Sequence, residues 1–264
     1  MEYARLTSPE VEALDKDGSV IVIPVAAIEQ HGPHLSLKTD TVLAEAVARR
    51  AAEKATANVL VTPAFWAGCS NHHMDFPGSL SLQQETFVRT LSEIALCFVR
   101  HGFKKLFFLN GHGHNLSPLQ LVARSVRDAT DGSVIAATGN YWHFIPDDIR
   151  RIRESPMGGM AHAGEFETSA MLAEAPEQVQ MDRAVTHMPK WKTPFFTMDF
   201  LASRPAYIAH HVSDFSPSGV FGAARLGTAQ KGEQLLDAAA SKIAAFLDDY
   251  AGWTLGTLYT LGDG

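Results

Sequence analysis

Residues 19–40 read SVIVIPVAAIEQHGPHLSLKTD, and this stretch joins an apolar run directly to a polar one. Residues 19–27 are apolar enough for a buried β-strand. The polar residues that follow at once include Glu29, His31, His34 and Asp40. A buried strand that runs straight into acidic and imidazole side chains predicts a central sheet with a polar site at one end.

Strand-like and helical patterns alternate along most of the chain. Further strands are expected over residues 58–65, 104–111 and 133–144. Apolar residues three or four apart predict helices over residues 40–55, 82–102, 116–130 and 232–250, and another that begins near Glu165 and ends before Pro176. Residues 182–222 are irregular, with one strand expected over residues 206–212. Because such alternation is typical of βαβ units, we expect an α/β fold with a mostly parallel sheet, helices on both faces and a single domain over residues 1–264.

The composition excludes several classes of partner. The 264 residues are 46% hydrophobic and carry a net charge of −7, and Lys and Arg form no block longer than a pair. Nucleic acid and acidic membrane surfaces are therefore not expected partners. We recognise no secretory signal and no apolar run of the ~18 residues that span a bilayer, and Cys69 and Cys97 form no CxxC pair. A cytoplasmic protein is therefore expected.

Polar side chains collect where the expected strands end. Glu29 and His31 follow the first strand, and Asp40 opens the next helix. The later blocks are GCSNHHMDFPGS (68–79) after the second strand, NGHGHN (110–115) at the end of the third, and AHAGEFETS (161–169) at the start of a helix. Ligands of open α/β sheets bind outside the carboxyl ends of the strands, so we expect these blocks to form one site.

The residue types in these blocks favour metal binding. Glu29 and His31 are two residues apart, so their side chains point to the same side of an extended chain. Together with Asp40 and His112 they make a mixed nitrogen and oxygen set, which suits Zn²⁺, Mn²⁺ or Fe²⁺. Two such ions about 3.5–4 Å apart can activate water and polarise a carbonyl group. Taken singly, such residues also have ordinary structural explanations. A carboxylate such as Asp40 is favourable at a helix start, and Cys69 in the block 68–79 is explained as a small buried thiol.

Four of these blocks together resemble the signature of the creatininase family of metal-dependent amidohydrolases: EQHGPHLSLKTD, GCSNHHMDFPGS, NGHGHN and HAGEFETS. They stand in the family's order between about residues 19 and 170, and the later SPSGVFG (216–222) is similar as well. The resemblance implies a three-layer α/β/α fold, a homohexamer and a dinuclear metal site. It matches the metal ligands to Glu29, His31, Asp40 and His112, with Asp40 bridging. It also matches His162 to the histidine that handles protons during amide cleavage, and Glu167 to a further acidic residue at the metals.

The chain departs from creatininase itself at several positions. Creatininase has a Glu two residues after its metal-binding His, where this chain has His114, so either His114 replaces that ligand or Glu167 completes the second metal. Gly158 and Gly159 stand where creatininase has a Trp and an Asp, and Gly113 replaces an aromatic residue. Those groups help to enclose creatinine, so the resemblance does not point to creatinine as the substrate.

The leading hypothesis is a dinuclear metal-dependent hydrolase that cleaves the C–N bond of a small cyclic amide. Its cofactors would be two divalent ions, Zn²⁺ first and Mn²⁺ or Fe²⁺ as alternatives. His162 would protonate the leaving nitrogen, whereas His73, Ser79 and Asn115 would position the substrate or the ligands. A formamide, a lactone or a short peptide remains an alternative substrate, and a non-catalytic metal-binding protein remains an alternative function.

Overall fold

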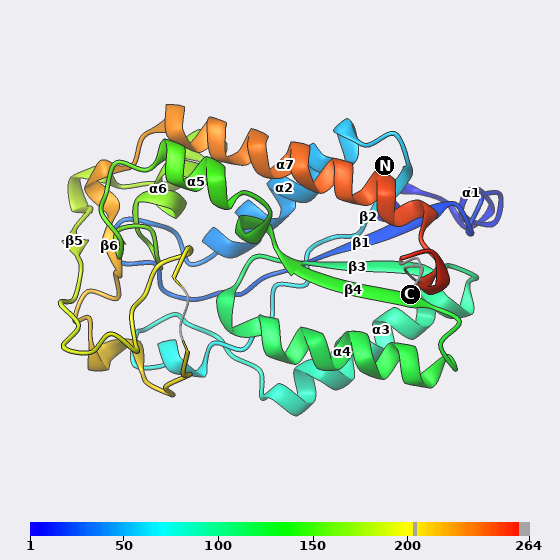
Figure 1. The fold of residues 1–264 in the computed structure, drawn as a ribbon, viewed down its shortest axis with the longest axis horizontal. Coiled ribbons are helices and arrows are strands. Elements are labelled where there is room, and N and C mark those ends of the chain that lie inside the picture. Colours follow the sequence, from blue (N-terminus) through cyan, green and yellow to red (C-terminus); the bar gives the residue numbers. More distant parts are fainter. Residues whose placement is uncertain (203–204, 259–264) are drawn as a thin grey trace, which may run out of the picture.

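The computed structural model describes residues 1–202 and 205–258 (Figure 1). Its central sheet has four parallel strands in the order β2-β1-β3-β4. These strands are β2 (Asn58–Val61), β1 (Ser19–Val25), β3 (Lys105–Asn110) and β4 (Ile135–Asn140). Because all four are parallel, their carboxyl ends meet at one edge of the sheet, towards the left of Figure 1.

β1 is buried on both faces, as a strand in the middle of a covered parallel sheet must be. Val20 and Val22 point into one apolar cluster, whereas Ile21 and Ile23 point into a second cluster on the opposite face. The side chains of β3 alternate between the two clusters in the same way. An apolar run without polar interruptions is therefore what this position in the sheet requires.

Helices cover both faces of the sheet and complete three layers (Figure 1). One layer contains α2 (Thr39–Lys54), α5 (Pro146–Ile152), α6 (Glu165–Glu174) and α7 (Ala229–Gly252). The other layer contains α3 (Gln84–Arg100) and α4 (Leu116–Ala129), and the short α1 (Ser8–Glu12) packs against the same cluster. The structure confirms the expected α/β fold with a parallel central sheet.

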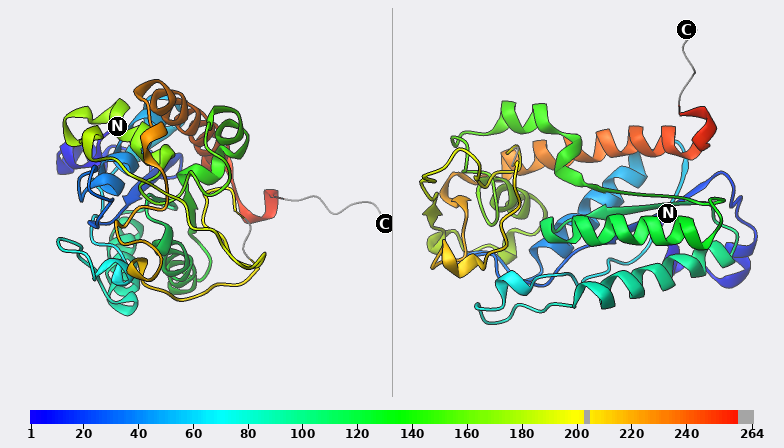
Figure 2. Two further views of the ribbon diagram at one scale, coloured as in Figure 1. Left: turned by 90° about the vertical axis from the view of Figure 1, so that its left-hand side faces the viewer. Right: turned by 60° about the horizontal axis from the view of Figure 1, so that its bottom comes forward.

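Short strands and 3₁₀ helices form the connections between the main elements and the region beyond the carboxyl ends of the parallel strands. β5 (Thr186–His187) and β6 (Gly222–Ala223) form an antiparallel pair. The 3₁₀ helices are Tyr3–Arg5, Asn71–His73, Gly113–Asn115, Tyr141–Phe144, Pro176–Gln178, Met181–Arg183, Val212–Asp214, Ala224–Leu226 and Leu255–Thr257. The described part of the segment 182–222, largely yellow in Figures 1 and 2, lies at the end of the molecule to which the strands point.

The helices agree with the sequence periodicity. The helix expected near Glu165 begins at that residue and ends at Glu174, before Pro176. The last helix begins earlier than expected because Thr228 caps it, accepting a hydrogen bond from the backbone N–H of Lys231 at 3.2 Å. Among the described residues, no helix is both long and apolar enough to cross a membrane.

Three expectations about strands are corrected by the structure. The strand expected over residues 58–65 ends at Val61. The strand expected over residues 206–212 is wrong: this stretch pairs with no strand among the described residues, and the side chains of Tyr207 and Ile208 are exposed. A strand needs a partner for its backbone N–H and C=O groups, and apolar side chains alone do not supply one. The fourth strand ends at Asn140 instead of continuing to residue 144, because the chain turns there into a 3₁₀ helix.

Candidate metal centre

The candidate ligands meet at the carboxyl edge of the sheet. They lie beyond β1 and β3 and in the first turns of α2 and α6, and all are buried: Glu29, His31, Asp40, His112 and Glu167. Gly111 allows β3 to approach α2 this closely. A Cβ at Gly111 would lie 2.9 Å from the Cβ of Ala44 and 3.0 Å from the carbonyl oxygen of Asp40. The absence of a side chain at Gly111 thus brings His112 up against the start of α2.

Asp40 divides its two carboxylate oxygens between two groups of donor atoms. Oδ2 lies 3.2 Å from Nδ1 of His112, which is also 3.2 Å from Oε1 of Glu29. Oδ1 lies 3.1 Å from Nε2 of His31, which is 3.8 Å from Oε2 of Glu167. Within each group, the three donor atoms lie within 4.8 Å of one another. Two adjacent groups that share one carboxylate suit a bridged pair of ions.

These donors fit metal ions. Ligand atoms at about 2.0–2.2 Å from one ion lie about 3–3.5 Å from each other, which matches most of the separations above. Both carboxylate oxygens of Glu29, Nε2 of His31 and Oδ2 of Asp40 are buried without a hydrogen-bond partner. Burying a carboxylate without partners is costly, and native proteins rarely do so unless an ion or ligand compensates. The donor set therefore fits divalent cations.

Backbone carbonyl groups set the tautomers of the two histidines in these groups. Nδ1 of His31 donates to the carbonyl oxygen of Glu29 at 3.1 Å. Nε2 of His112 donates to the carbonyl oxygen of Cys69 at 3.1 Å. Since a carbonyl oxygen can only accept, the second ring nitrogen is the one that faces Asp40, and it is unprotonated whenever the ring is neutral. Metal-binding histidines commonly make a second contact of this kind.

The buried carboxylates perturb the titration of the whole cluster. Burial by itself would lower the pKa of His31, but Asp40 beside it raises that pKa to about 10. Glu29 and Asp40 likewise raise the pKa of His112 against the effect of burial. Burial raises the pKa of Glu167 to about 7, and the charge of Asp40 adds to the rise. These shifts favour the protonated forms of all three groups, because the buried carboxylates attract positive charge.

His162 lies beside the cluster and keeps some contact with solvent. Its side chain is 18% exposed, against 0–6% for the five candidate ligands. Nε2 lies 2.8 Å from the carbonyl oxygen of Gln30, and Nδ1 lies 3.6 Å from Oε1 of Glu29. The next residue, Ala163, has a φ of 52°, which residues with a side chain rarely adopt, and its N–H donates to Oε2 of Glu167 at 2.5 Å. This strained turn fixes His162 relative to Glu167.

Two of the expected positioning residues contact the segment that carries Glu29. Nε2 of His73 lies 3.3 Å from Oε1 of Glu29. The hydroxyl of Ser79 accepts a hydrogen bond from the backbone N–H of Gln30 at 3.1 Å. Both side chains are buried, so the structure gives them contacts to the ligand segment and little access to a substrate.

Asn115 connects two chain segments, one at Cys69 and the other at Ala26. Its Oδ1 accepts from the N–H of Cys69 at 2.9 Å, and its Nδ2 donates to the carbonyl oxygen of Ala26 at 3.0 Å. Cys69 itself is buried, and burial raises the pKa of its thiol to about 11. A thiol in this state suits packing rather than nucleophilic attack.

The sequence did not single out Gln30 or His72 as part of the site. The side-chain Nε2 of Gln30 lies 2.8 Å from Nδ1 of His73 and 3.0 Å from Nε2 of His162, while its Oε1 accepts from the N–H of Gly32 at 2.8 Å. The side-chain amide of Gln30 therefore lies in contact with two histidines of the site. The only available signal was position, because both residues stand inside the quoted blocks beside residues that were singled out.

His114 shares a donor group with His72 and His112 but not with Asp40. Its Nδ1 makes a hydrogen bond with Nε2 of His72, and the two rings are perpendicular, with centroids 3.5 Å apart. Burial, and then the proximity of His114, lowers the pKa of His72. The candidate ligand group that contains His114 includes neither Asp40 nor Glu167. Glu167, by contrast, shares a donor group with His31 and Asp40.

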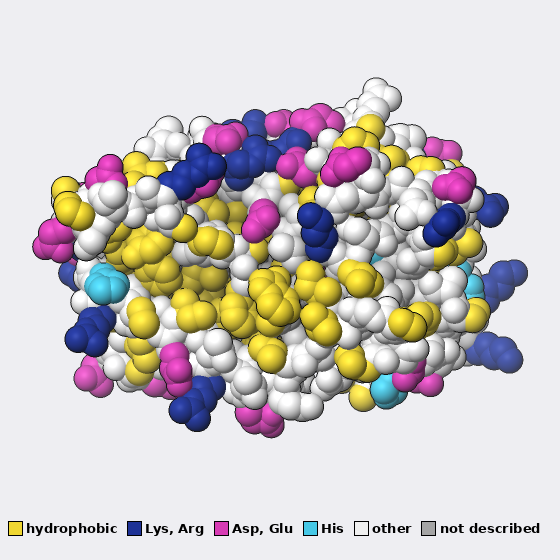
Figure 3. All heavy atoms as spheres, turned by 180° about the vertical axis from the view of Figure 1, so that it is seen from behind, with side chains coloured by type: hydrophobic (Ala, Val, Ile, Leu, Met, Phe, Trp, Pro, Cys, Tyr) yellow, Lys and Arg dark blue, Asp and Glu magenta, His cyan; other side chains and the backbone are white. Residues whose placement is uncertain are grey.

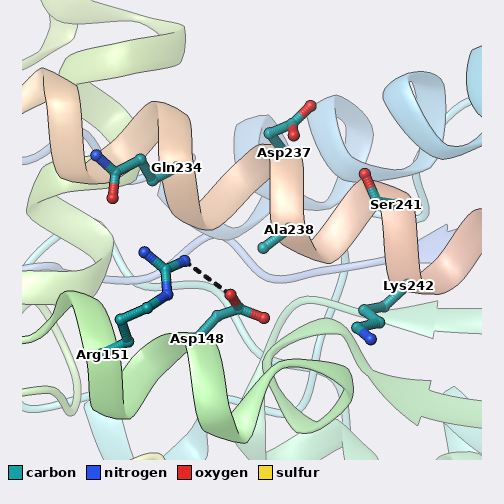
Figure 4. Close-up of a pocket in the computed structure, with 7 residues that line it drawn as sticks. All are labelled: Asp148, Arg151, Gln234, Asp237, Ala238, Ser241 and Lys242. Atoms are coloured by element: carbon teal, nitrogen blue, oxygen red, sulfur yellow. Dashed lines mark hydrogen bonds and ion pairs between the residues drawn. The ribbon is translucent and has the colours of Figure 1, made fainter.

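A separate groove lies between α5 and α7 (Figure 4). Its lining residues are Asp148, Arg151, Gln234, Asp237, Ala238, Ser241 and Lys242. Asp148 pairs with Arg151 at 2.8 Å, and Asp237 pairs with Lys54 at 2.7 Å. The charges of this groove are therefore largely matched, and it contains none of the clustered histidines.

Known proteins are similar to this chain over most of its length. The family model described as Creatininase: Creatinine amidohydrolase matches residues 4–247. The creatinine amidohydrolase of Pseudomonas putida is 32% identical over 256 residues, which cover 91% of this chain and 93% of that protein. The 3-dehydro-scyllo-inosose hydrolase of Thermotoga maritima is 29% identical over 89% of this chain and 79% of its own length. The mycofactocin precursor peptide peptidase of Mycobacterium tuberculosis is 34% identical over 68% of each protein.

Solved structures have the same fold. A crystal structure of creatinine amidohydrolase (creatininase) aligns with a TM-score of 0.79 at 29% identity, over 96% of this chain and 98% of its own. Two further creatininase structures, designated Mn and Zn-Zn type, have TM-scores of 0.78 and 0.77 at 29% identity, each over 94% of this chain and 97% of its own. These alignments agree with the α/β architecture described above.

Proposed function

The chain belongs to the creatininase family of metal-dependent amidohydrolases, and from this premise we propose that it is a dinuclear metal-dependent hydrolase. Its reaction is the cleavage of the C–N bond in a small cyclic amide. The observation that carries the proposal is the division of the Asp40 oxygens between two buried groups of donors, several of which lack a hydrogen-bond partner. Zn²⁺ is the first candidate ion, and Mn²⁺ or Fe²⁺ also suits mixed nitrogen and oxygen donors.

The two ions would share five protein ligands. One position would be held by Glu29, Asp40 and His112, and the other by His31, Asp40 and Glu167. Glu167 completes the second position in preference to His114, because its Oε2 is the donor that lies near Nε2 of His31. Ions at these positions would supply a Lewis acid for the substrate carbonyl and an activated water.

His162 would move the proton that amide cleavage requires. An amide nitrogen is a poor leaving group unless it is protonated, so a positioned acid matters for this reaction. Burial lowers the pKa of His162, which favours a neutral ring that accepts a proton before it donates one. The carbonyl oxygen of Gln30 holds Nε2, so Nδ1 is the nitrogen that faces the Glu29 side of the centre.

The glycines around the site support a substrate other than creatinine. A Cβ at Gly113 would have no neighbour within 4 Å, so the site is open at the position where creatininase has an aromatic side chain. A Cβ at Gly159 would lie 2.2 Å from the Cβ of Ser155, so the backbone there leaves no room for a side chain. These two positions therefore do not enclose a small ring.

A formamide, a lactone or a short peptide is the alternative substrate. The relatives support this alternative, since they include a precursor peptide peptidase and an inosose hydrolase. The open side at Gly113 would also admit a molecule larger than one small ring. The non-catalytic alternative is weaker, because metal storage needs neither His162 nor a solvent-accessible face beside the ligands.

We further propose that residues 1–264 form a single domain that works in the cytoplasm as a homohexamer. Both apolar clusters are built on the same sheet, which supports one domain. Hydrophobic side chains gather across the middle of the face in Figure 3, and an exposed patch of this kind is typical of a protein–protein interface. Analytical ultracentrifugation tests the assembly, and a monomer at micromolar concentration would contradict it.

Metal analysis of the purified protein, combined with a hydrolysis screen, tests the proposed function. We expect two divalent ions per chain and metal-dependent turnover of a cyclic amide, with formamides, lactones and short peptides in the same screen. A chelator should abolish turnover, and added Zn²⁺ or Mn²⁺ should restore it. Bound metal without turnover of any of these substrates would favour the non-catalytic alternative. A protein that binds no divalent ion after reconstitution would overturn the proposal.

A further inference from the structure

Two backbone groups fix the orientation of the side-chain amide of Gln30, which is buried. Its Oε1 accepts a hydrogen bond from the N–H of Gly32 at 2.8 Å, and its Nε2 donates to the carbonyl oxygen of Gly219 at 3.1 Å. A backbone N–H can only donate and a backbone carbonyl can only accept, so the oxygen and the nitrogen of this amide cannot exchange places. One N–H of the amide is left, and its direction is therefore fixed as well.

Both backbone partners are glycines that allow the chain to approach the amide closely. Gly219 belongs to the block SPSGVFG (216–222), and Gly219 and Gly32 have φ values of 77° and 66°. A Cβ at Gly219 would lie 1.9 Å from Oε1 of Gln30, and a Cβ at Gly32 would lie 2.4 Å from Cγ2 of Val220. The block at residues 216–222 thus packs directly against this amide, which gives the block a place in the site.

The remaining N–H of the amide points to Nδ1 of His73. Nε2 of Gln30 lies 2.8 Å from that nitrogen and 3.0 Å from Nε2 of His162. His162 cannot accept this N–H, because its Nε2 lies 2.8 Å from the carbonyl oxygen of Gln30 and carries the proton that the carbonyl accepts. The amide therefore donates to Nδ1 of His73, and the neutral His73 ring carries its own proton on Nε2.

The position of this proton decides what the other side of the His73 ring can bind. Nε2 of His73 lies 3.3 Å from Oε1 of Glu29, and Nδ1 of His112 lies 3.2 Å from the same oxygen. Two ligands of one zinc ion lie about 3–3.5 Å apart, so the distance alone would let His73 bind an ion at Glu29 as His112 would. A protonated imidazole nitrogen has no lone pair for a metal. The tautomer of His73, and not its position, therefore excludes it as a ligand.

We propose that Gln30 is a positioning residue that holds the proton on Nε2 of His73 and so keeps a coordination position open on the ion at Glu29. The inference rests on the proposed metal centre. A catalytic metal site keeps a position for water or substrate, whereas a site with a complete set of protein ligands is structural. The N–H of His73 also places the positive end of its dipole beside the carboxylate of Glu29, as groups around metal ligands commonly do.

Neutron diffraction tests the proton positions directly. Crystals of the unaltered protein, metal-free and loaded with Zn²⁺, would be measured at about pH 8, where an ordinary imidazole is neutral. We expect deuterium on Nε2 of His73, none on its Nδ1, and an amide deuterium of Gln30 directed at Nδ1. Deuterium on Nδ1 of His73, or Zn²⁺ bound to its Nε2, would overturn the inference. The metal-free crystal separates this result from the proposed function, because the tautomer can be read even if the centre binds no ion.

The substitution Gln30→Met fills the same space without the amide and tests what the amide controls. Without this donor, the proton of His73 can sit on Nδ1, and Nε2 is free to bind the ion. A crystal structure of the Zn²⁺-loaded variant should show Nε2 of His73 at about 2.0–2.1 Å from the ion at Glu29. Because the ion would gain a ligand, the variant should also lose Zn²⁺ to a chelator more slowly than the unaltered protein.

The matched control is Gln178→Met. Oε1 of Gln178 accepts a hydrogen bond from the hydroxyl of Ser36 at 2.9 Å, so this variant also removes a glutamine contact to the segment after β1. It should leave His73 off the metal and the loss of Zn²⁺ unchanged. A Zn²⁺-loaded Gln30→Met in which His73 stays off the metal would remove this role from Gln30. If Gln30→Met does not fold, Gln30→Leu repeats the comparison, and the neutron measurement on the unaltered protein depends on neither variant.

Discussion

Two buried polar side chains at the same edge of the sheet, those of Asn115 and Asp40, differ in whether their polar atoms have hydrogen-bond partners. The amide of Asn115 is paired at both ends, because it accepts from the N–H of Cys69 and donates to the carbonyl oxygen of Ala26. The carboxylate of Asp40 is as deeply buried but leaves Oδ2 without a hydrogen-bond partner. Burial of a polar group therefore does not by itself mark a candidate ligand, whereas a buried carboxylate without a hydrogen-bond partner is the stronger signal.

The same contrast separates Asn110 from Glu29. Nδ2 of Asn110 donates to the carbonyl oxygen of His112 and to Oδ1 of Asn140, at 2.6 and 2.7 Å. Both carboxylate oxygens of Glu29 lack a hydrogen-bond partner. The paired amides hold the strand ends together, whereas the unpaired carboxylates are the groups that a cation would compensate. Substitutions in the two sets should therefore have different consequences, on stability in one set and on metal content in the other.

The substitution Asp40→Ala should have the largest effect on the metal centre. Because both groups of donors share this carboxylate, the variant should lose both ions and all turnover. A charge at a helix start contributes only about 0.3–1 kcal/mol, so the protein should remain folded. Metal analysis and circular dichroism measure the two outcomes. A folded variant that retains two ions would show that Asp40 does not bridge them.

Glu167→Ala should have the next largest effect and remove one of the two ions at Asp40. The reason is that Glu167 belongs to one of the two donor groups only. His114→Ala is the matched comparison and should keep both of these ions. Metal counting and a crystal structure of the metal-loaded variant measure the result. If His114→Ala loses an ion at Asp40 and Glu167→Ala does not, the second position belongs to His114.

His162→Asn should keep both ions and lose amide turnover by about 10²–10⁴-fold, which is the usual contribution of a general acid or base. The loss should be smaller for an activated ester or a lactone of similar shape, because its oxygen leaves without full protonation. Steady-state kinetics on both substrates, with metal analysis of the same preparation, measure the difference. Near-normal amide turnover, or a missing ion, would each remove the proton-transfer role from His162.

The substitution Asn115→Ala should affect the metal centre least and act mainly on stability. It leaves the N–H of Cys69 and the carbonyl group of Ala26 unpaired, at about 1–3 kcal/mol each. Denaturant unfolding of the metal-free protein should show this loss. The variant should still bind two ions, with an affinity lowered about 10–100-fold, because the carbonyl oxygen of Cys69 orients His112. Unchanged stability with loss of both ions would abolish the distinction between Asn115 and Asp40.

Much of the architecture could be predicted from the sequence because its signals are local. The apolar run over residues 19–27 forms a strand over Ser19–Val25 that is buried on both faces, and the helix expected at Glu165 begins there. The strand expected over residues 206–212 failed because a strand also depends on a neighbour. Tyr207 and Ile208 have suitable side chains, but their backbone has no strand beside it in the part of the chain that the structure describes.

By itself, the sequence determined the fold class, the family and the residue types available for a metal centre. Parallel strand ends must meet at one edge, so the blocks that follow the strands were expected to converge. Only the tertiary structure decided that Asp40 divides its oxygens between two donor groups and that His114 turns toward His72. The physical reason is that the periodicity of helices and strands depends on residues close together in the chain. The partner of each donor atom depends instead on how segments far apart in the chain pack against one another.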